Sequence, residues 1–312
     1  MRMKTPVWID SDCGIDDAIA LLAAFKLDSL DIKGISAVCG NVEEEKTFVN
    51  NRNIAYMANR KDIKVYHGAT KPLNITLETA SHVHGNNGLG NIVIDESDAP
   101  VETEMAWDMI YKAAKEANGE LELVAVGPLT NVAIAIAKYP DLEKYIKRLL
   151  IMGGAIEGGN ASTAAEFNIF ADPHAAQAVF KSEIPKVMFG LDVTLQSSLN
   201  LNDLNRLKAK DSTVSNFFLE SIKTLMKFYD AIGYKDTVCL HDACPILYLQ
   251  YPELFNGKVA GVYVETQGQI TFGKTVSDLH SDFKFDKRDT LVMLSVNQQV
   301  FSKTIEDLLL SY

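Results

Sequence analysis

The chain has 312 residues, of which 47% are hydrophobic and 23% charged, a composition typical of a soluble globular protein rather than a disordered or fibrous one. Thirty basic and 41 acidic residues give a net charge of −11, which argues against nucleic acids and anionic membranes as partners because like charges repel. No apolar run approaches the roughly 18–20 residues of a membrane span, and the apolar stretch before Asp10 is too short for a signal peptide. We therefore expect a cytoplasmic protein.

Short apolar runs alternate with segments whose apolar residues recur at helical spacing. The runs predicted to be buried strands are residues 7–9, 32–38, 64–66, 121–126, 149–152 and 187–191. The segments predicted to be helices are residues 17–27, 43–59, 102–117, 129–138 and 173–180. This alternation predicts an α/β fold with a mostly parallel central sheet flanked by helices.

The pattern changes after residue 199. Helices are predicted at about 201–208 and 214–229 and from about residue 242, and strands at 258–265, 269–275 and 291–296 precede a final helix. No Pro-, Gly- or Ser-rich linker, low-complexity run or internal repeat interrupts the sequence. Residues 1–312 are therefore expected to form a single α/β domain.

An acidic motif directly follows the first predicted strand and precedes an apolar helix. It reads Asp10-Ser11-Asp12-Cys13-Gly14-Ile15-Asp16-Asp17. Acidic residues favour helix N-termini, so Asp16 and Asp17 could serve only as caps. Carboxylates this close repel one another, however, unless a cation or bound donors compensate. Because ligands of such sheets bind at the carboxyl ends of the strands, the motif predicts a metal site there, and oxygen ligands favour Ca²⁺ or Mg²⁺ over zinc.

Further polar residues follow the later strands. Glycine turns occur at Cys39-Gly40-Asn41, Val126 to Asn131 and Met152 to Ala155, and each alone could be only a turn. The segment Glu166-Phe167-Asn168, if extended, places two polar side chains on one face. The pair His241-Asp242 precedes a helix for which Asp242 could be the N-cap, and His82 and His84 lie in a stretch rich in Gly and Asn that is typical of a surface loop.

The four cysteines, Cys13, Cys39, Cys239 and Cys244, fall in loops that we expect near the site. Four cysteines in a chain of this length do not indicate a disulfide framework, and their spacing does not suit a zinc site. We expect them to be buried and to behave as small apolar residues.

These motifs resemble those of the nucleoside hydrolases of the inosine–uridine-preferring type, over nearly the whole chain. The carrying motif is Asp-x-Asp-Pro-Gly-x-Asp-Asp, present here as residues 10–17. The supporting motifs occur in the family's order: Gly40-Asn41, Val83-His84-Gly85, Gly127 to Asn131, Met152-Gly153-Gly154, Glu166-Phe167-Asn168 and His241-Asp242. The resemblance implies hydrolysis of the N-glycosidic bond of ribonucleosides to ribose and free base, in nucleoside catabolism and base salvage, by a homotetramer or homodimer.

The resemblance also implies a role for each matching residue. Asp12, Asp17, Asp242 and the backbone carbonyl of Val126 would bind one Ca²⁺, and Asp12 would be the general base for the Ca²⁺-bound water. The ribose would be contacted by Asp16, Asn160, Glu166, Asn168 and Asp242, with Met152 packed beneath it. Asn41 would lie near the attacking water and the glycosidic nitrogen, His84 would line the pocket, and His241 would act at the leaving base.

The chemistry of glycosidic cleavage agrees with these residue types. The ribosyl group becomes oxocarbenium-like in the transition state, and carboxylates around the sugar stabilise that positive charge. A bound Ca²⁺ lowers the pKa of its water, whose proton Asp12 accepts. A histidine that titrates near neutral pH can donate a proton to the departing base.

The sequence departs from the family pattern in a few places. Cys13 replaces a proline, Asn87 replaces an aspartate of the glycine loop, and Ala243 replaces the proline that follows His-Asp. Residues 233–237 are also atypical. The preferred base therefore stays open, as does the question of whether Tyr229 or Tyr234 assists His241.

Two other functions compete with this one. A haloacid-dehalogenase-like phosphatase would use Asp10 as its nucleophile, but it leaves Asp16, Asp17 and the Glu166/Asn168 pair unexplained. A nucleoside-binding or regulatory protein that has lost turnover would keep the pocket, but the intact Asp12 argues against it. Release of free ribose from uridine and inosine would separate the three functions.

Overall fold

One sheet runs through the protein and takes its strands from both ends of the chain. The computed structural model describes residues 4–199, 204–235, 237–280, 285 and 287–312. Within these residues, nine strands form a sheet in the order β3-β2-β1-β4-β5-β6-β9-β7-β8. Their bounds are β1 Thr5–Ser11, β2 Leu30–Ala37, β3 Val65–Tyr66, β4 Leu121–Ala125, β5 Ile146–Met152, β6 Lys186–Phe189, β7 Phe255–Val264, β8 Thr275–Asp278 and β9 Thr290–Val296.

The sheet is mostly parallel, as the sequence predicts. All neighbours from β3 along to β9 pair in parallel, and only β7 runs antiparallel, to β9 on one side and β8 on the other. Every residue of β4 is buried, because parallel sheets are covered on both faces and their strands are therefore nearly continuous apolar runs.

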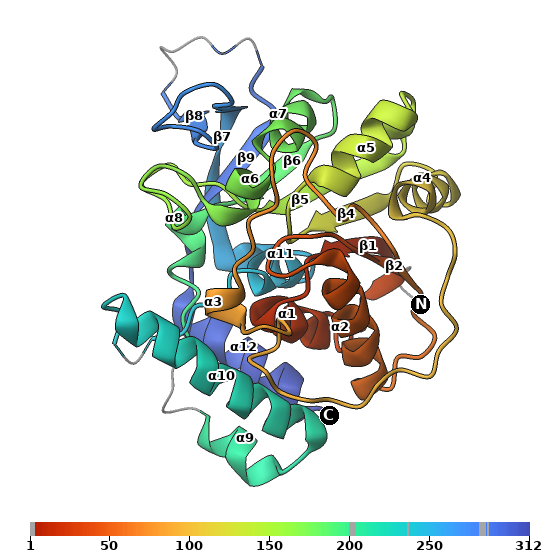
Figure 1. Cartoon of the computed structure of the whole chain (residues 1–312), viewed down its shortest axis with the longest axis vertical. Helices are drawn as coiled ribbons and strands as arrows, with labels where there is room; N and C mark the ends of the chain where they lie inside the picture. Colours follow the sequence, from red (N-terminus) through yellow and green to blue (C-terminus); the bar gives the residue numbers. More distant parts are fainter. Residues whose placement is uncertain (1–3, 200–203, 236, 281–284, 286) are drawn as a thin grey trace.

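Helices cover both faces of this sheet (Figure 1). One buried apolar cluster contains α1 (Ile15–Ala24), α2 (Glu44–Met57), α11 (Ala243–Tyr248) and α12 (Gln298–Leu310). The other contains α4 (Ala106–Glu116), α5 (Thr130–Lys138) and α7 (Pro173–Lys181). The remaining elements are α3 (Ser81–His84), α6 (Phe167–Ala171), α8 (Leu191–Thr194), α9 (Asn205–Lys210), α10 (Thr213–Ala231) and two short 3₁₀ turns, Leu142–Lys144 and Pro252–Leu254. No helix in the described part of the chain combines the length and the apolar character that a membrane span requires.

Several element boundaries differ from the prediction. The segment 269–275 is a turn rather than a strand, because Gly273 adopts a positive φ of 79° and the amide of Lys274 closes back on the carbonyl of Thr271; the strand is β8, Thr275–Asp278. The predicted strand 187–191 ends at Phe189, and the predicted helix 102–117 begins only at Ala106. The first residues of the predicted helix 201–208 lie outside the described residues, and α9 begins at Asn205.

The strand order places the candidate site. From β1 the chain passes to β2 on one side, whereas β4 pairs with β1 on the other side. A reversal of this kind leaves a crevice at the carboxyl ends of the strands, where ligands of open α/β sheets bind. The loops after β1, β2, β4 and β5 all end at this crevice, and they carry the motifs that the sequence singles out.

Candidate active site

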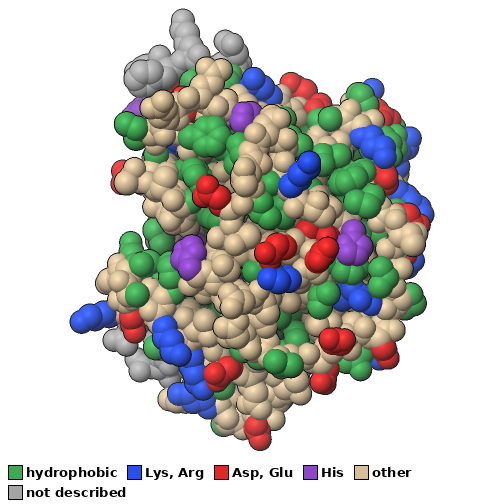
Figure 2. Space-filling view, viewed as in Figure 1, with side chains coloured by type: hydrophobic (Ala, Val, Ile, Leu, Met, Phe, Trp, Pro, Cys, Tyr) green, Lys and Arg blue, Asp and Glu red, His purple; other side chains and the backbone are tan. Residues whose placement is uncertain are grey.

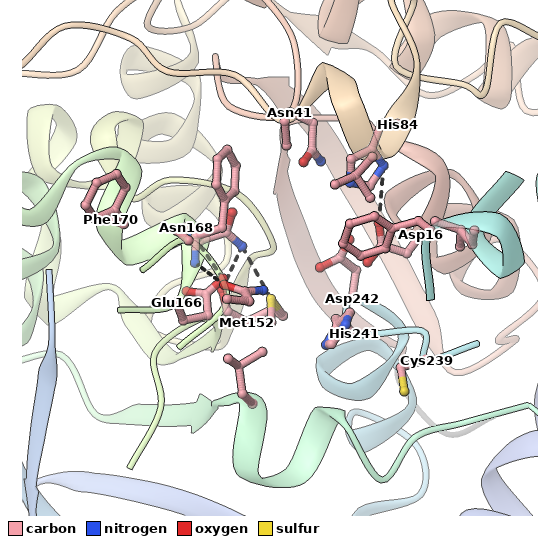
Figure 3. Close-up of a pocket in the computed structure, with 18 of the residues that line it drawn as sticks. Asp16, Asn41, His84, Met152, Glu166, Asn168, Phe170, Cys239, His241 and Asp242 are labelled. Atoms are coloured by element: carbon pink, nitrogen blue, oxygen red, sulfur yellow. Dashed lines mark hydrogen bonds and ion pairs between the residues drawn. The ribbon is translucent and has the colours of Figure 1, made fainter. Parts of the chain in front are cut away.

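A cavity of about 650 Å³ opens at this edge of the sheet. Its lining includes ten of the residues predicted from the sequence: Asp16, Asn41, His84, Val126, Met152, Asn160, Glu166, Asn168, His241 and Asp242. Figure 3 shows Glu166, Asn168 and Met152 on one side, and Asp16, Asp242 and His241 on the other. The two remaining predicted residues, Asp12 and Asp17, are fully buried and do not line the cavity.

Asp17 holds the loop between β1 and α1. One of its carboxylate oxygens accepts the Ser11 hydroxyl at 2.8 Å. The other accepts the backbone amide of Gly14 at 2.9 Å and the side-chain amide of Asn41 at 3.1 Å. The capping role considered for Asp17 is therefore present, and the same carboxylate also faces the acidic cluster described below.

Asp12 has one carboxylate oxygen bonded and one free. Its Oδ2 accepts the backbone amide of Asn41 at 2.8 Å, whereas its buried Oδ1 has no hydrogen-bond partner among the described residues. A Cβ at Gly40 would lie 2.1 Å from Oδ2, and a Cβ at Gly127 would lie 2.7 Å from Oδ1. From the sequence, Gly40 and Gly127 could be only turn residues. In the structure, any side chain at either position would clash with the Asp12 carboxylate.

Three carboxylates form a compact acidic trio. Asp16, Asp17 and Asp242, all buried, each offer an oxygen within 4.8 Å of the others. Burial raises the pKa of Asp17 to about 6, and burial with the neighbouring carboxylates raises the pKa of Asp12 and of Asp242. Such mutual repulsion is what a divalent cation relieves. The trio contains Asp16, which the sequence assigns to the ribose, and it does not contain Asp12.

Asp242 is not a side-chain cap. It occupies the N-cap position of α11, but its carboxylate accepts no hydrogen bond from the first amides of that helix. The structural explanation considered for this residue from the sequence is therefore wrong, and its carboxylate is left to the acidic trio.

Asn168 joins two strand ends. Its side-chain amide donates to the carbonyl oxygen of Val126 at 2.7 Å and to that of Met152 at 3.1 Å. The Val126 carbonyl, which is predicted to bind a metal, therefore also accepts a hydrogen bond from Asn168. The same amide group links the ends of β4 and β5, where Val126 and Met152 line the cavity.

Glu166 marks the start of a short helix. The segment is not extended beyond Glu166: this residue is the N-cap of α6, and its carboxylate accepts the amides of Asn168 at 2.8 Å and Ile169 at 3.2 Å. It also accepts the amide of Gly154 at 2.8 Å. Burial raises the pKa of Glu166 to about 7 against the opposing effect of these three amides. Asn160 supports the same turn by accepting the amide of Phe167 at 2.8 Å.

His84 has a defined ring orientation. Its Nδ1 accepts the backbone amide of Ile15 at 3.1 Å and lies 3.9 Å from the carboxylate of Asp16 (Figure 3). Burial lowers the pKa of His84 to about 4, so the ring is neutral and its proton is on Nε2. His82 packs edge-on against Phe228, with ring centroids 6.4 Å apart.

His241 is held from both ring nitrogens. Its Nε2 lies 2.7 Å from the hydroxyl of Tyr229, and its Nδ1 lies 2.7 Å from the hydroxyl of Thr194. Burial lowers the pKa of His241 and raises that of Tyr229. Of the two tyrosines considered from the sequence, Tyr229 is therefore the one that contacts His241. Tyr234 is 47% exposed and contacts the ring of Tyr229 edge-on. The sequence gives no signal for Thr194, because only the fold brings α8 against the loop that carries His241.

Asp10 lies beneath the cavity rather than in it. It is fully buried, and one oxygen accepts the Ser36 hydroxyl and, at 2.7 Å, the side-chain amide of Asn131. A phosphatase nucleophile must reach its substrate, so this position argues against the phosphatase alternative.

The four cysteines are free and buried, as predicted. Burial raises the pKa of Cys239 to about 11 and that of Cys39 and Cys244 to about 12. The acidic trio contains no cysteine. The cysteines therefore stay protonated near neutral pH and behave as small apolar side chains.

Comparisons with known proteins agree with this geometry. The family model described as inosine-uridine preferring nucleoside hydrolase matches residues 7–303. The pyrimidine-specific ribonucleoside hydrolase RihA of Escherichia coli O1:K1 / APEC is 38% identical over 312 residues, covering 99% of this chain and all of the relative. A plant nucleoside hydrolase, the PpNRh1 enzyme, superposes with a TM-score of 0.93 at 30% identity and covers 99% of both chains. A purine-preferring ribonucleoside hydrolase from Gardnerella vaginalis gives a TM-score of 0.92 at 28% identity and covers 98% of both. The chain therefore belongs to the inosine–uridine-preferring nucleoside hydrolase family and is an N-glycosidase.

Proposed function

We propose that this enzyme cleaves the N-glycosidic bond of ribonucleosides to ribose and free base, with Asp12 accepting a proton from the attacking water. The observation that carries the assignment is the Oδ1 atom of Asp12, which is buried and has no hydrogen-bond partner among the described residues. A buried carboxylate oxygen without a donor is uncommon. Asp10 has one as well, but of the two carboxylates only that of Asp12 is bonded to a residue that lines the cavity, Asn41. Burial and the nearby Asp17 raise the pKa of Asp12 in the metal-free protein, and a bound cation favours the ionised carboxylate that can accept a proton.

The residues fit a single Ca²⁺. We assign Asp12, Asp17, Asp242 and the Val126 carbonyl as its ligands. Asp17 and Asp242 belong to the acidic trio, whose third member, Asp16, we assign to the sugar. The donors are all oxygens, and the site gathers several carboxylates that repel one another when no cation is near. The chemistry that Ca²⁺ supplies when bound is positive charge, which offsets the carboxylates and makes a coordinated water more acidic.

Ribose fits the polar half of the cavity. Asp16 and Asn168 face each other across it (Figure 3), and Asn160, Glu166 and Met152 also line it. We assign these residues to the sugar. The transition state places positive charge on the ribosyl ring, and the surrounding carboxylates stabilise that charge more than they stabilise the neutral substrate.

The base fits the other half. The lining there is apolar or aromatic, from Leu191, Leu195, Leu225, Phe228 and Ile232. Tyr229 and, behind it, His241 are polar groups on this side, and the Tyr229 hydroxyl, held by His241, donates a hydrogen bond to the negative charge that develops on the departing base. Asn41, which contacts Asp12 and Asp17, lies between the two halves, near the bond that breaks.

We also propose a preference for pyrimidine ribonucleosides. The support is the relative named pyrimidine-specific, which is 38% identical, against 28% for the structure named purine-preferring. Turnover of uridine and cytidine should exceed that of inosine and adenosine in kcat/KM. The reverse order would remove this preference and leave the glycosidase assignment intact.

The central experiment measures free ribose released from uridine and inosine by the purified protein in Ca²⁺ buffer. Catalytic ribose release is the expected result. Nucleoside binding by calorimetry without ribose release would instead indicate a binding protein. Release of phosphate from phosphomonoesters with no ribose would indicate a phosphatase. A homotetramer or homodimer is also part of the proposal, and light scattering tests it.

A further inference from the structure

Thr194 makes a contact that no role assigned so far uses. It is the last residue of α8, its side chain is fully buried, and its Oγ1 lies 2.7 Å from Nδ1 of His241. The opposite ring nitrogen of His241 contacts the hydroxyl of Tyr229, also at 2.7 Å. The three side chains therefore form a line that starts in the buried core and ends at the cavity.

We propose that Thr194 is a positioning residue that fixes the orientation and the tautomer of His241, and through it directs the Tyr229 hydroxyl toward the leaving base. This inference rests on the proposed function, in which His241 and Tyr229 act at the base. It adds a residue that does not itself touch the substrate.

The direction of the hydrogen bonds follows from burial. Among the described residues, the Thr194 hydroxyl has no hydrogen-bond partner other than His241, and a buried hydroxyl whose hydrogen lacks an acceptor costs free energy. The hydroxyl therefore donates to Nδ1, which must then carry a lone pair. A neutral imidazole with an unprotonated Nδ1 carries its hydrogen on Nε2, so Nε2 donates to the oxygen of Tyr229.

The Tyr229 hydrogen is thereby turned away from the histidine. Tyr229 lines the cavity, and the nearby Cys239 thiol donates to the carbonyl of Leu195 at 3.3 Å, leaving only a weakly accepting sulfur on the Tyr229 side. A departing base is a stronger acceptor than this sulfur. Without the Thr194 donor, the ring could adopt the other tautomer, and the Tyr229 hydrogen would then point to Nε2 instead of the base.

The backbone holds Thr194 and His241 in register. The amide of Leu199 donates to the carbonyl of Val238 at 2.8 Å, and the amide of Leu240 donates to the carbonyl of Ser197 at 3.3 Å. The Ser197 hydroxyl lies 2.6 Å from the Thr194 carbonyl and 3.2 Å from that of Leu240. Thr194 can orient the His241 ring only if the backbone holds both residues in place, and these hydrogen bonds do so.

The test compares T194V, which keeps the shape and removes the hydroxyl, with T194S, which keeps the hydroxyl. Each is assayed with uridine and with 4-nitrophenyl riboside, whose leaving group needs no hydrogen-bond donor. T194V should lower kcat/KM for uridine by roughly 10–100-fold with little change in KM, and should leave the nitrophenyl substrate within about threefold. T194S should restore uridine turnover to within about threefold of the wild type.

Two further variants separate the possible failures. S182A removes a buried hydroxyl that donates to the carbonyl of Val179 and does not line the cavity, and its ratio of uridine to nitrophenyl turnover should equal that of the wild type. H241A should show the same selective loss as T194V, and a larger one. If H241A is selective and T194V slows both substrates equally, Thr194 only packs and this inference fails alone. If H241A slows both equally, the role of His241 at the base fails as well.

A spectroscopic measurement tests the tautomer without any substitution. Nitrogen-15 shifts of the six histidines, with His241 assigned by its absence in H241A, should show the hydrogen on Nε2 in the wild-type protein loaded with Ca²⁺. T194V should shift the population toward hydrogen on Nδ1. A wild-type ring with its hydrogen on Nδ1 would overturn the proposal even if T194V failed to fold.

Discussion

The carboxylates beside the cavity differ in how many donors each one has. Asp17 accepts bonds from Ser11, Gly14 and Asn41, and Glu166 accepts three backbone amides. Asp12 accepts the amide of Asn41 on one oxygen, and its other oxygen has no partner among the described residues. The well-bonded carboxylates shape loops. Asp10 also has an oxygen without a partner, but Asp12 is the one bonded to Asn41 of the cavity lining.

Replacing Asp12 by Asn should abolish most turnover and leave the fold intact. The variant keeps the volume and the oxygen that accepts the Asn41 amide but loses the proton acceptor, so kcat/KM for uridine should fall by about 10²–10⁴-fold. Steady-state kinetics with metal analysis by mass spectrometry checks this. The matched control is Asp62→Asn, which changes an exposed aspartate paired with Arg60 and should keep full activity. Near-normal turnover of D12N with metal bound would reject Asp12 as the base.

A 2′-deoxynucleoside should be a poor substrate. If Asp16, Asn168 and the cation engage the 2′-hydroxyl, its removal leaves buried polar groups unpaired, an arrangement that rejects such analogues strongly. The easier ionisation of a deoxyribosyl group opposes this effect, so we expect uridine to exceed 2′-deoxyuridine by at least about 10² in kcat/KM, or roughly 2.7 kcal/mol. Comparing the two in one buffer decides the point. Equal values would contradict the assignment of the sugar contacts.

Among the elements, the long ones were predictable and the short ones were not. The parallel strands and helices such as α2 and α5 follow from apolar runs and helical periodicity, which are properties of a local window. The helices α6 and α8 have five and four residues, too few for a period to be visible. The sequence therefore left open that Glu166 lies in an extended segment, whereas in the structure it is the N-cap of α6 and lines the cavity.

The site was predictable to a similar extent. Motifs with an unusual density of polar residues, such as residues 10–17, indicate chemistry by themselves. The contact between Thr194 and His241, and the acidic trio that includes Asp16 rather than Asp12, depend on how loops approach one another in space. The spacing of residues within one segment of the sequence does not predict the distances between side chains of different segments.

Asn131 is fully buried and connects three segments of the chain, so its loss should destabilise the fold. Its side-chain amide donates to Asp10 at 2.7 Å and to the carbonyl of Ala37 at 2.8 Å, and its oxygen accepts the amide of Ala69 at 2.8 Å. N131A leaves these buried groups without partners, which should lower the free energy of unfolding by about 2–4 kcal/mol. Urea unfolding measures the change. Asn216→Ala, at an exposed pair with Asp211, is the control, and an equally stable N131A would contradict this role.

Acidic and basic side chains are interspersed on the face of the molecule shown in Figure 2, whereas the buried charge near the site is almost entirely acidic. Burial raises the pKa of Asp10 to about 7, that of Asp17 to about 6 and that of Glu166 to about 7. All three shifts have the same sign, so their effects on the stability of the metal-free protein reinforce one another.

The metal-free protein should lose stability as the pH rises from about 4.5 to 7. Because the folded-state pKa of each carboxyl is raised, the folded protein holds protons that the unfolded chain has already released, and the free energy of unfolding falls with increasing pH in that window. The lowered pKa values of His84 and His241 act in the opposite direction, but on fewer groups. The slope is at most about 1.4 kcal/mol per pH unit for each group. Chemical unfolding in a chelator across this range measures it, and D10N should flatten the slope. Addition of Ca²⁺ should stabilise the protein most at the upper end. A stability that rises with pH in the chelator would contradict the pKa directions.

The acidic trio joins residues that are far apart in the chain: Asp16 and Asp17 lie in the first turn of α1, in the red part of Figure 1, and Asp242 is the N-cap of α11, in the blue part. Synthesis on the ribosome proceeds from the N-terminus, so a nascent chain carries two of these carboxylates long before the third emerges. The acidic trio is therefore completed only when most of the chain has been made and α11 has packed against α1. A chain that terminates before residue 242 would lack the trio even if its first strands had paired.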